Sequence, residues 1–206
     1  MRPTDPAALL MDSMMPDFDI ALAEHAVVQS DTATTFATTR DINLLTVHSP
    51  VLDLFIWLRT VPARIVGRHP TTPTTPKIGE NMALPGWGYL GQTPGHEIVF
   101  GAVGRFWQSV IQWRDTAATD FTDFAEPGWG KIAADFSVRT YGASTSLLCY
   151  ECRFLTTDPG SRVRFGRHRW LIRPFVRHIM RTTLRQIKAN AESLTVNSTL
   201  AQAVSK

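Results

Sequence analysis

Residues 145–192, TSLLCYECRFLTTDPGSRVRFGRHRWLIRPFVRHIMRTTLRQIKANAE, contain the strand-to-helix transition that decides the fold. The first part fits the last strand of a sheet, and Asp158 and Pro159 are suited to the N-cap and the first position of a following helix. Pro174 removes one helical hydrogen bond and predicts a kink. Beyond it, one helix face carries Val176, Ile179, Thr183 and Ile187, and the opposite face carries Arg177, Arg181, Arg185 and Lys188. We therefore expect a long, kinked, amphipathic helix docked by its apolar face.

The two cysteines of the chain, Cys149 and Cys152, lie within this strand in the spacing of a redox or metal motif. Residues three apart in a strand point to opposite faces, so the two thiols are expected to diverge. A redox pair needs a helix N-terminus at its first cysteine, and here the helix starts several residues later. A structural zinc site needs two further ligands, and no suitably spaced histidine pair accompanies the cysteines. We predict free thiols, with Cys152 as a small buried apolar residue.

The rest of the chain predicts an antiparallel sheet with few helices. Alternating apolar residues predict strands over 18–28, 86–92, 96–107 and 131–141, and capping signals predict two short helices over 30–42 and 49–61. Residues 68–85 are rich in Thr and Pro and predict a connector loop, with a lid as the alternative. We expect a disordered N-terminus over 1–15, a single domain over 16–192 and a flexible tail over 193–206.

Charge and hydropathy limit the function classes. The net charge is +3, but residues 158–192 hold eight Arg and one Lys against two acidic residues. Such a basic segment is a candidate face for anions, carried by Arg177, Arg181, Arg185 and Lys188, although a solvated helix face is the simpler interpretation. No apolar run is long enough for a membrane span, and the N-terminus does not fit a secretory signal, so we expect a cytoplasmic protein.

Three segments carry a resemblance to a known superfamily: GHEIVFGAVGRFW (95–107), FAEPGWGKIAADFSV (124–138) and YECRFLTTDPGSRVRFGRHRWLIRPF (150–175). The chain resembles the SRPBCC superfamily of START, Bet v 1-like and polyketide cyclase-like proteins, and within it an uncharacterised bacterial branch. The resemblance implies an α+β helix-grip fold, in which a curved antiparallel sheet wraps around the long C-terminal helix. It also implies a cavity between sheet and helix, and it leaves the function open because the superfamily includes both enzymes and carriers.

Candidate cavity residues are those expected on the inward faces of the strands and helices. Apolar walls with a few polar tips suit a flat or aliphatic ligand, whereas the alternative is that these residues are ordinary core. His96 and Tyr150 are the candidates for a catalytic acid or base. The expected cavity lining is Trp57, Trp87, Tyr89, Phe100, Phe136, Tyr150, Cys152 and Trp170.

These features favour a non-enzymatic protein that binds a hydrophobic small molecule or lipid. A cyclase- or hydratase-like enzyme using the same cavity is the first alternative, and an interaction module using the basic helix face is the second. No phosphate loop, dinucleotide fingerprint or metal-ligand pattern is present, so no cofactor is expected. Nucleic acid is not an expected partner, since no aromatic residues interleave with the basic stripe for base stacking. A homo-oligomer is compatible with the sequence.

Overall fold

The computed structural model describes residues 9–42, 86–108 and 111–204. The predicted helix over 49–61, the loop over 68–85 and Trp57 lie outside these residues. In chain order the described elements are α1 (Leu10–Met14), β1 (Ile20–Val28), α2 (Thr32–Asp41), β2 (Trp87–Thr93), β3 (Glu97–Gly104), β4 (Trp113–Arg114), α4 (Ala118–Phe121), β5 (Gly130–Gly142), β6 (Thr145–Thr156) and α5 (Pro159–Val204).

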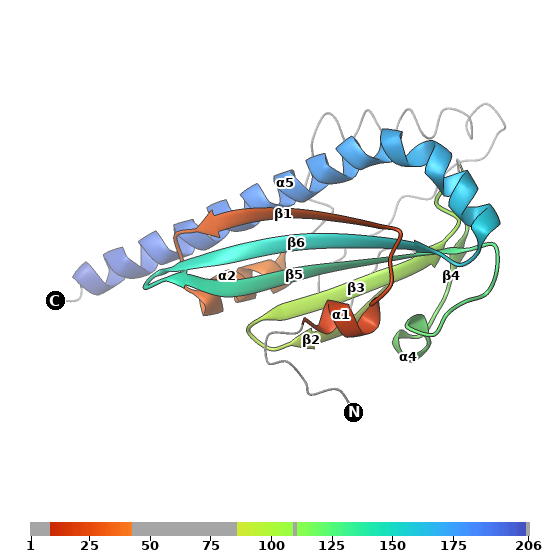
Figure 1. Ribbon diagram of the computed structural model, residues 1–206. Coiled ribbons are helices and arrows are strands. Elements are labelled where there is room, and N and C mark those ends of the chain that lie inside the picture. The colour runs from red at the N-terminus through yellow and green to blue at the C-terminus, as the bar shows by residue number, and fades with distance from the viewer. Residues whose placement is uncertain (1–8, 43–85, 109–110, 205–206) are drawn as a thin grey trace, which may run out of the picture.

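The described strands form one antiparallel sheet in the order β1-β6-β5-β3-β2, and β4 pairs with β3 (Figure 1). Strands β5 and β6 are the longest, with 13 and 12 residues, and they pair along almost their whole length. The β2–β3 hairpin turns at Gly95, whose φ of 77° is the left-handed conformation that glycine tolerates best. The predicted α+β class is confirmed, with an antiparallel sheet and a long C-terminal helix packed against it.

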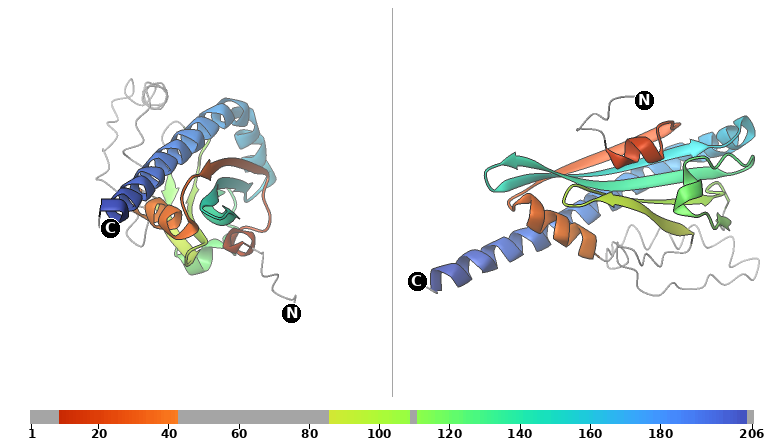
Figure 2. Two further views of the ribbon diagram at one scale, coloured as in Figure 1. Left: turned by 90° about the vertical axis from the view of Figure 1, so that its left-hand side faces the viewer. Right: turned by 90° about the horizontal axis from the view of Figure 1, so that it is seen from below.

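Helix α5 begins at the predicted cap. Asp158 accepts hydrogen bonds from the backbone amide of Ser161 at 3.0 Å and from the backbone amide of Gly128 at 2.6 Å. The helix has 46 residues and contains Pro174. Figure 1 shows that its axis changes direction between the first, cyan turns and the blue remainder. The helix continues into the segment predicted as a flexible tail, 193–206, as far as Val204, and it projects beyond the sheet in both Figure 1 and Figure 2.

The main core lies between the sheet and helices α2 and α5, on what we call the inner face of the sheet. Alternation along the strands places every second, apolar side chain on this face. Apolar residues of α5 at helical spacing pack against them. Burying a large apolar side chain contributes about 1.5–3 kcal/mol, so this face dominates the stability of the fold. The apolar residues of α2, its C-cap Ile42 and α5 that are buried here are Phe36, Ile42, Phe165, Met180, Leu184, Ile187 and Ala191.

A second, smaller core covers the opposite, outer face of the sheet. Helices α1 and α4 pack there, and α1 and α2 lie on opposite sides of the sheet in Figure 2. Met11 and Met15 are 0% and 1% exposed. The expectation of disorder therefore does not hold for residues 9–15, which are anchored by two buried methionines. No helix in the described part of the chain is long and apolar enough to cross a membrane.

Candidate functional site

A row of aromatic rings crosses the inner face of the sheet. The Trp87 and Phe100 ring centroids are 5.5 Å apart, those of Phe100 and Phe136 are 5.8 Å apart, and those of Phe136 and Tyr150 are 4.2 Å apart. The four residues come from β2, β3, β5 and β6, which are neighbours in the sheet. Because inward-facing residues alternate along each strand, the register aligns the rings into one continuous surface.

Six of the eight predicted cavity residues belong to this inner surface. Phe100, Phe136, Tyr150 and Cys152 are buried, while Trp87 and Tyr89 on β2 are only partly buried. Trp57 lies outside the described residues, and Trp170 lies on α5 with a side chain that the structure does not describe. Strand alternation thus predicted correctly which side chains share a face. That they line an open cavity stays a prediction.

The two candidate catalytic residues are not brought together. His96 lies exposed at the end of the β2–β3 turn, where its backbone carbonyl accepts a hydrogen bond from the Val138 amide at 2.7 Å. Tyr150 lies in the middle of β6, and β5 separates it from β3. Two strand spacings are about 10 Å, so no hydrogen bond joins their side chains. Burial raises the pKa of Tyr150 well above its usual value, so the phenol stays protonated and cannot serve as a base.

A polar group that the sequence analysis missed borders the aromatic row. Glu24 is the register partner of Tyr150 and lies on the inner face of β1. Its carboxylate is 2.9 Å from Nε of Arg181 and 3.6 Å from Nε of Arg177, both on α5. A charged residue within the alternating apolar positions of a strand is the signal that could have revealed it.

The basic face of α5 is therefore partly engaged by the chain itself. Arg177 and Arg181 contact Glu24, and Lys188 donates to the Val27 carbonyl at 2.7 Å and lies 3.4 Å from Glu192. Arg185 is exposed. The predicted role of these four residues toward an external anion is untested, but three of them already have partners within the chain.

A buried hydroxyl on α5 is the second polar feature of the inner face. Thr183 is 0% exposed, and its Oγ1 has no hydrogen-bond partner. Buried polar groups in folded proteins are nearly always paired with protein, water or ligand. Thr183 lies on the face of the helix that was predicted to be apolar. A hydroxyl at such a position was the sequence signal for a buried polar group. The Thr183 hydroxyl, the Glu24 carboxylate and the Tyr150 phenol are thus polar groups that border a mostly apolar inner face.

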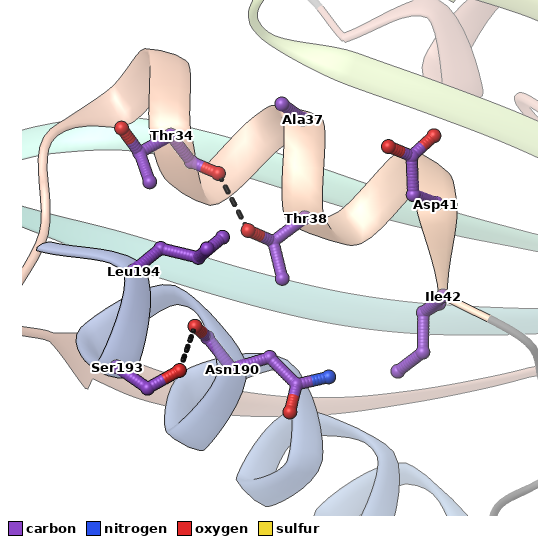
Figure 3. Close-up of a pocket in the computed structure, with 8 residues that line it drawn as sticks. All are labelled: Thr34, Ala37, Thr38, Asp41, Ile42, Asn190, Ser193 and Leu194. Carbon is purple, nitrogen blue, oxygen red and sulfur yellow. Dashed lines mark hydrogen bonds between the residues drawn. The ribbon is translucent and has the colours of Figure 1, made fainter. Parts of the chain in front are cut away.

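A separate pocket of about 490 Å³ lies between α2 and the later part of α5 (Figure 3). Two of its hydroxyls are satisfied by their own helices, since Thr38 donates to the Thr34 carbonyl and Ser193 donates to the Asn190 carbonyl. The sequence could not predict this pocket, because it depends on how two helices far apart in the chain pack. It is lined by Thr34, Ala37, Thr38, Asp41, Ile42, Asn190, Ser193 and Leu194.

The cysteines behave as predicted. Cys152 is buried in the inner core, and Cys149 is half-buried on the outer face with its Sγ 3.1 Å from Nδ1 of His25. Both thiols are free, and burial raises the pKa of each above its usual value. Within residues 9–42, 86–108 and 111–204, no group of three or more His, Cys, Asp or Glu side chains could hold a metal ion.

Comparison with known proteins does not assign a family. No family model matches the chain, and no curated protein matches its sequence. Among solved structures, the crystal structure of CalU16 from Micromonospora echinospora matches over 84% of this chain and 84% of its own, with 10% sequence identity and a TM-score of 0.28. A score at this level supports no argument about fold or function. The sheet and the C-terminal helix are compatible with the SRPBCC resemblance, which stays a prediction.

Proposed function

We propose that the protein binds a hydrophobic small molecule or lipid against the inner face of its sheet. The observation that carries the proposal is the aromatic row from Trp87 through Phe100 and Phe136 to Tyr150. Of the described helices, α5 packs chiefly on β1 and β6, and α2 on β5 and β6. The row begins at the partly exposed Trp87 on β2 and runs inward, so a ligand entering from that side meets aromatic walls first.

The polar groups on this face suit orientation of a ligand rather than chemistry on it. Ligand pockets are mostly apolar and contain a few convergent polar groups. Here Glu24 is held by two arginines, Tyr150 stays protonated, and Thr183 has an unused hydroxyl. These groups favour an apolar ligand with one hydroxyl or amide at the α5 side.

The enzymatic alternative has weaker support. A cyclase or hydratase needs an acid or base whose tip reaches the ligand. Glu24, the acid that the structure adds to this face, is already ion-paired with Arg181, and His96 is remote from Tyr150. The alternative of a basic interaction face is weakened in the same way, since Arg177, Arg181 and Lys188 have partners within the chain.

Native mass spectrometry of the protein as purified from its expression host tests the proposal first. We expect an added mass close to one ligand per chain, and extraction with organic solvent then identifies the molecule. An unloaded protein whose melting temperature does not respond to a panel of fatty acids, sterols and aromatic polyketides would show that the inner face is a filled core. That outcome would refute the proposal.

Titration with the fluorescent apolar probe anilinonaphthalene sulfonate locates the site. We expect Trp87→Leu to weaken binding about tenfold, which corresponds to roughly 1.4 kcal/mol. Trp129→Leu is the matched control, because Trp129 is also partly buried but packs on the outer face. Equal effects of the two substitutions would place the probe elsewhere and contradict an inner-face site.

A further inference from the structure

The outer face of the sheet contains a buried carboxyl group that has no function in the proposed ligand site. Asp135 on β5 is 0% exposed, and neither of its side-chain oxygens has a hydrogen-bond partner. Its register partner on β6 is Glu151, and Glu97 lies on the same face of the adjacent strand β3. Three acidic side chains therefore share one face of three neighbouring strands, at the site where α1 docks.

Two charged groups that flank Asp135 hold α1 in place. The Glu97 carboxylate accepts hydrogen bonds from the backbone amides of Leu10 at 2.6 Å and Met11 at 2.9 Å. The Arg153 guanidinium donates to the Met15 carbonyl at 3.0 Å and to the Asp12 carboxylate at 2.6 Å. The two ends of α1 are thus fixed by residues whose electrostatic environment depends on the charge of Asp135.

The cluster is unbalanced in charge. Arg153 already forms ion pairs with Glu151, at 2.6 Å, and with Asp12. Its single positive charge therefore faces two carboxylates even when Asp135 is protonated. An additional buried negative charge would repel Glu97 and compete for Arg153, which are the two groups that hold α1. The charged groups that act on Asp135 are Glu97 on β3 and Glu151 and Arg153 on β6. The other titratable or charged groups on this face are Lys131 and Arg139 on β5, Cys149 on β6, Asp12 on α1, and His25 on β1, which contacts Cys149.

We propose that α1 is a pH-controlled cover of the outer face: loss of the Asp135 proton releases residues 9–15, while the sheet and α5 stay folded. Release hydrates the Asp135 carboxylate and exposes the apolar surface on which Met11 and Met15 pack. That surface consists of Leu90, Val99, Val103, Phe121 and Ala133.

The titration behaviour of the cluster supports this direction. Burial, followed by the charges of Glu97 and Glu151, raises the pKa of Asp135 to about 8. Burial also raises the pKa of Glu97 above its usual value. A carboxyl whose pKa is higher in the docked state binds its proton more tightly there. Docking is therefore strongest at acidic pH, weakens as pH rises from the ordinary carboxyl range toward 8, and levels off above it.

Hydrogen–deuterium exchange of the full chain, corrected for the intrinsic pH dependence of exchange, tests the proposal. We expect protection of residues 9–15 to fall about tenfold or more between about pH 6 and pH 9, since one proton changes an equilibrium by at most tenfold per pH unit. Peptides from β5, β6 and α5 serve as the internal reference and should keep their protection. Unchanged protection of residues 9–15 across this range would overturn the proposal.

Substitutions identify the responsible group. Asp135→Asn removes the charge with little change in shape, so residues 9–15 should stay protected at alkaline pH. Asp115→Asn, at an exposed aspartate, is the matched control and should behave like the wild type. A variant Asp135→Asn that retains the full loss of protection would refute the assignment. If that variant does not fold, Glu151→Gln decides. Removing this neighbouring negative charge lowers the docked-state pKa of Asp135, so the loss of protection should be smaller than in the wild type and should level off at a lower pH. An unchanged loss of protection in Glu151→Gln would refute the assignment.

Discussion

Replacing Met11 by Ala tests whether the N-terminal segment is part of the folded domain. Met11 is 0% exposed and packs among the buried residues of the outer face. Truncating a buried methionine to alanine costs about 2–5 kcal/mol, from lost transfer free energy and from the cavity left behind. Here the cost has a ceiling, because α1 has five residues and can detach instead of tolerating the cavity. We therefore expect a loss near the lower end, about 2 kcal/mol.

Urea unfolding followed by circular dichroism measures this loss. Removal of residues 1–15 gives the ceiling, and Met11→Ala should destabilise the protein by no more than that deletion. Ser13→Ala is the control on the same helix, since Ser13 is exposed and should change stability by less than about 0.5 kcal/mol. If both the deletion and Met11→Ala leave the free energy of unfolding unchanged, residues 9–15 contribute nothing and the docking of α1 described above is refuted.

Three further predictions concern buried polar and titratable groups. In protein stripped of ligand, Thr183→Val removes a buried hydroxyl that has no partner in the chain and should raise the free energy of unfolding by about 1 kcal/mol; a loss of stability would contradict an unpaired hydroxyl. Thiol titration of the native protein should leave Cys152 unmodified and modify Cys149 slowly, whereas fast reaction of both would contradict their burial. Because the pKa of Asp135 is raised to about 8, wild-type stability should fall with rising pH by at most about 1.4 kcal/mol per unit between about pH 5 and 8. Asp135→Asn should reduce that slope, and an identical slope in both proteins would exclude Asp135 as its source.

Local patterns explain which elements were predictable. Strands β5 and β6 alternate in polarity, and the cap at Asp158 with Pro159 sets the start of α5, so each could be recognised from neighbouring residues alone. The same alternation placed Phe100, Phe136, Tyr150 and Cys152 on one face. These features depend on short-range periodicity, which the sequence displays directly.

Tertiary contacts determine the remaining features. Helix α1 has too few residues to show a period, and its order depends on Glu97 and Arg153, which are far away in the chain. The inward position of Glu24 was visible, but its two arginine partners follow only from how α5 lies along β1. The pocket between α2 and α5 likewise depends on the meeting of two distant segments.

Strand β1 forms one edge of the described sheet, pairing with β6 alone among the described strands. An edge strand presents unpaired backbone groups that another chain can extend, which makes such edges starting points for aggregation. On β1, the Val27 carbonyl accepts a hydrogen bond from the Lys188 ammonium, and α5 packs along the strand. A charged side chain at this position deters strand addition. The helix that packs across the inner face thereby also protects the β1 edge of the sheet against edge-to-edge association with another chain.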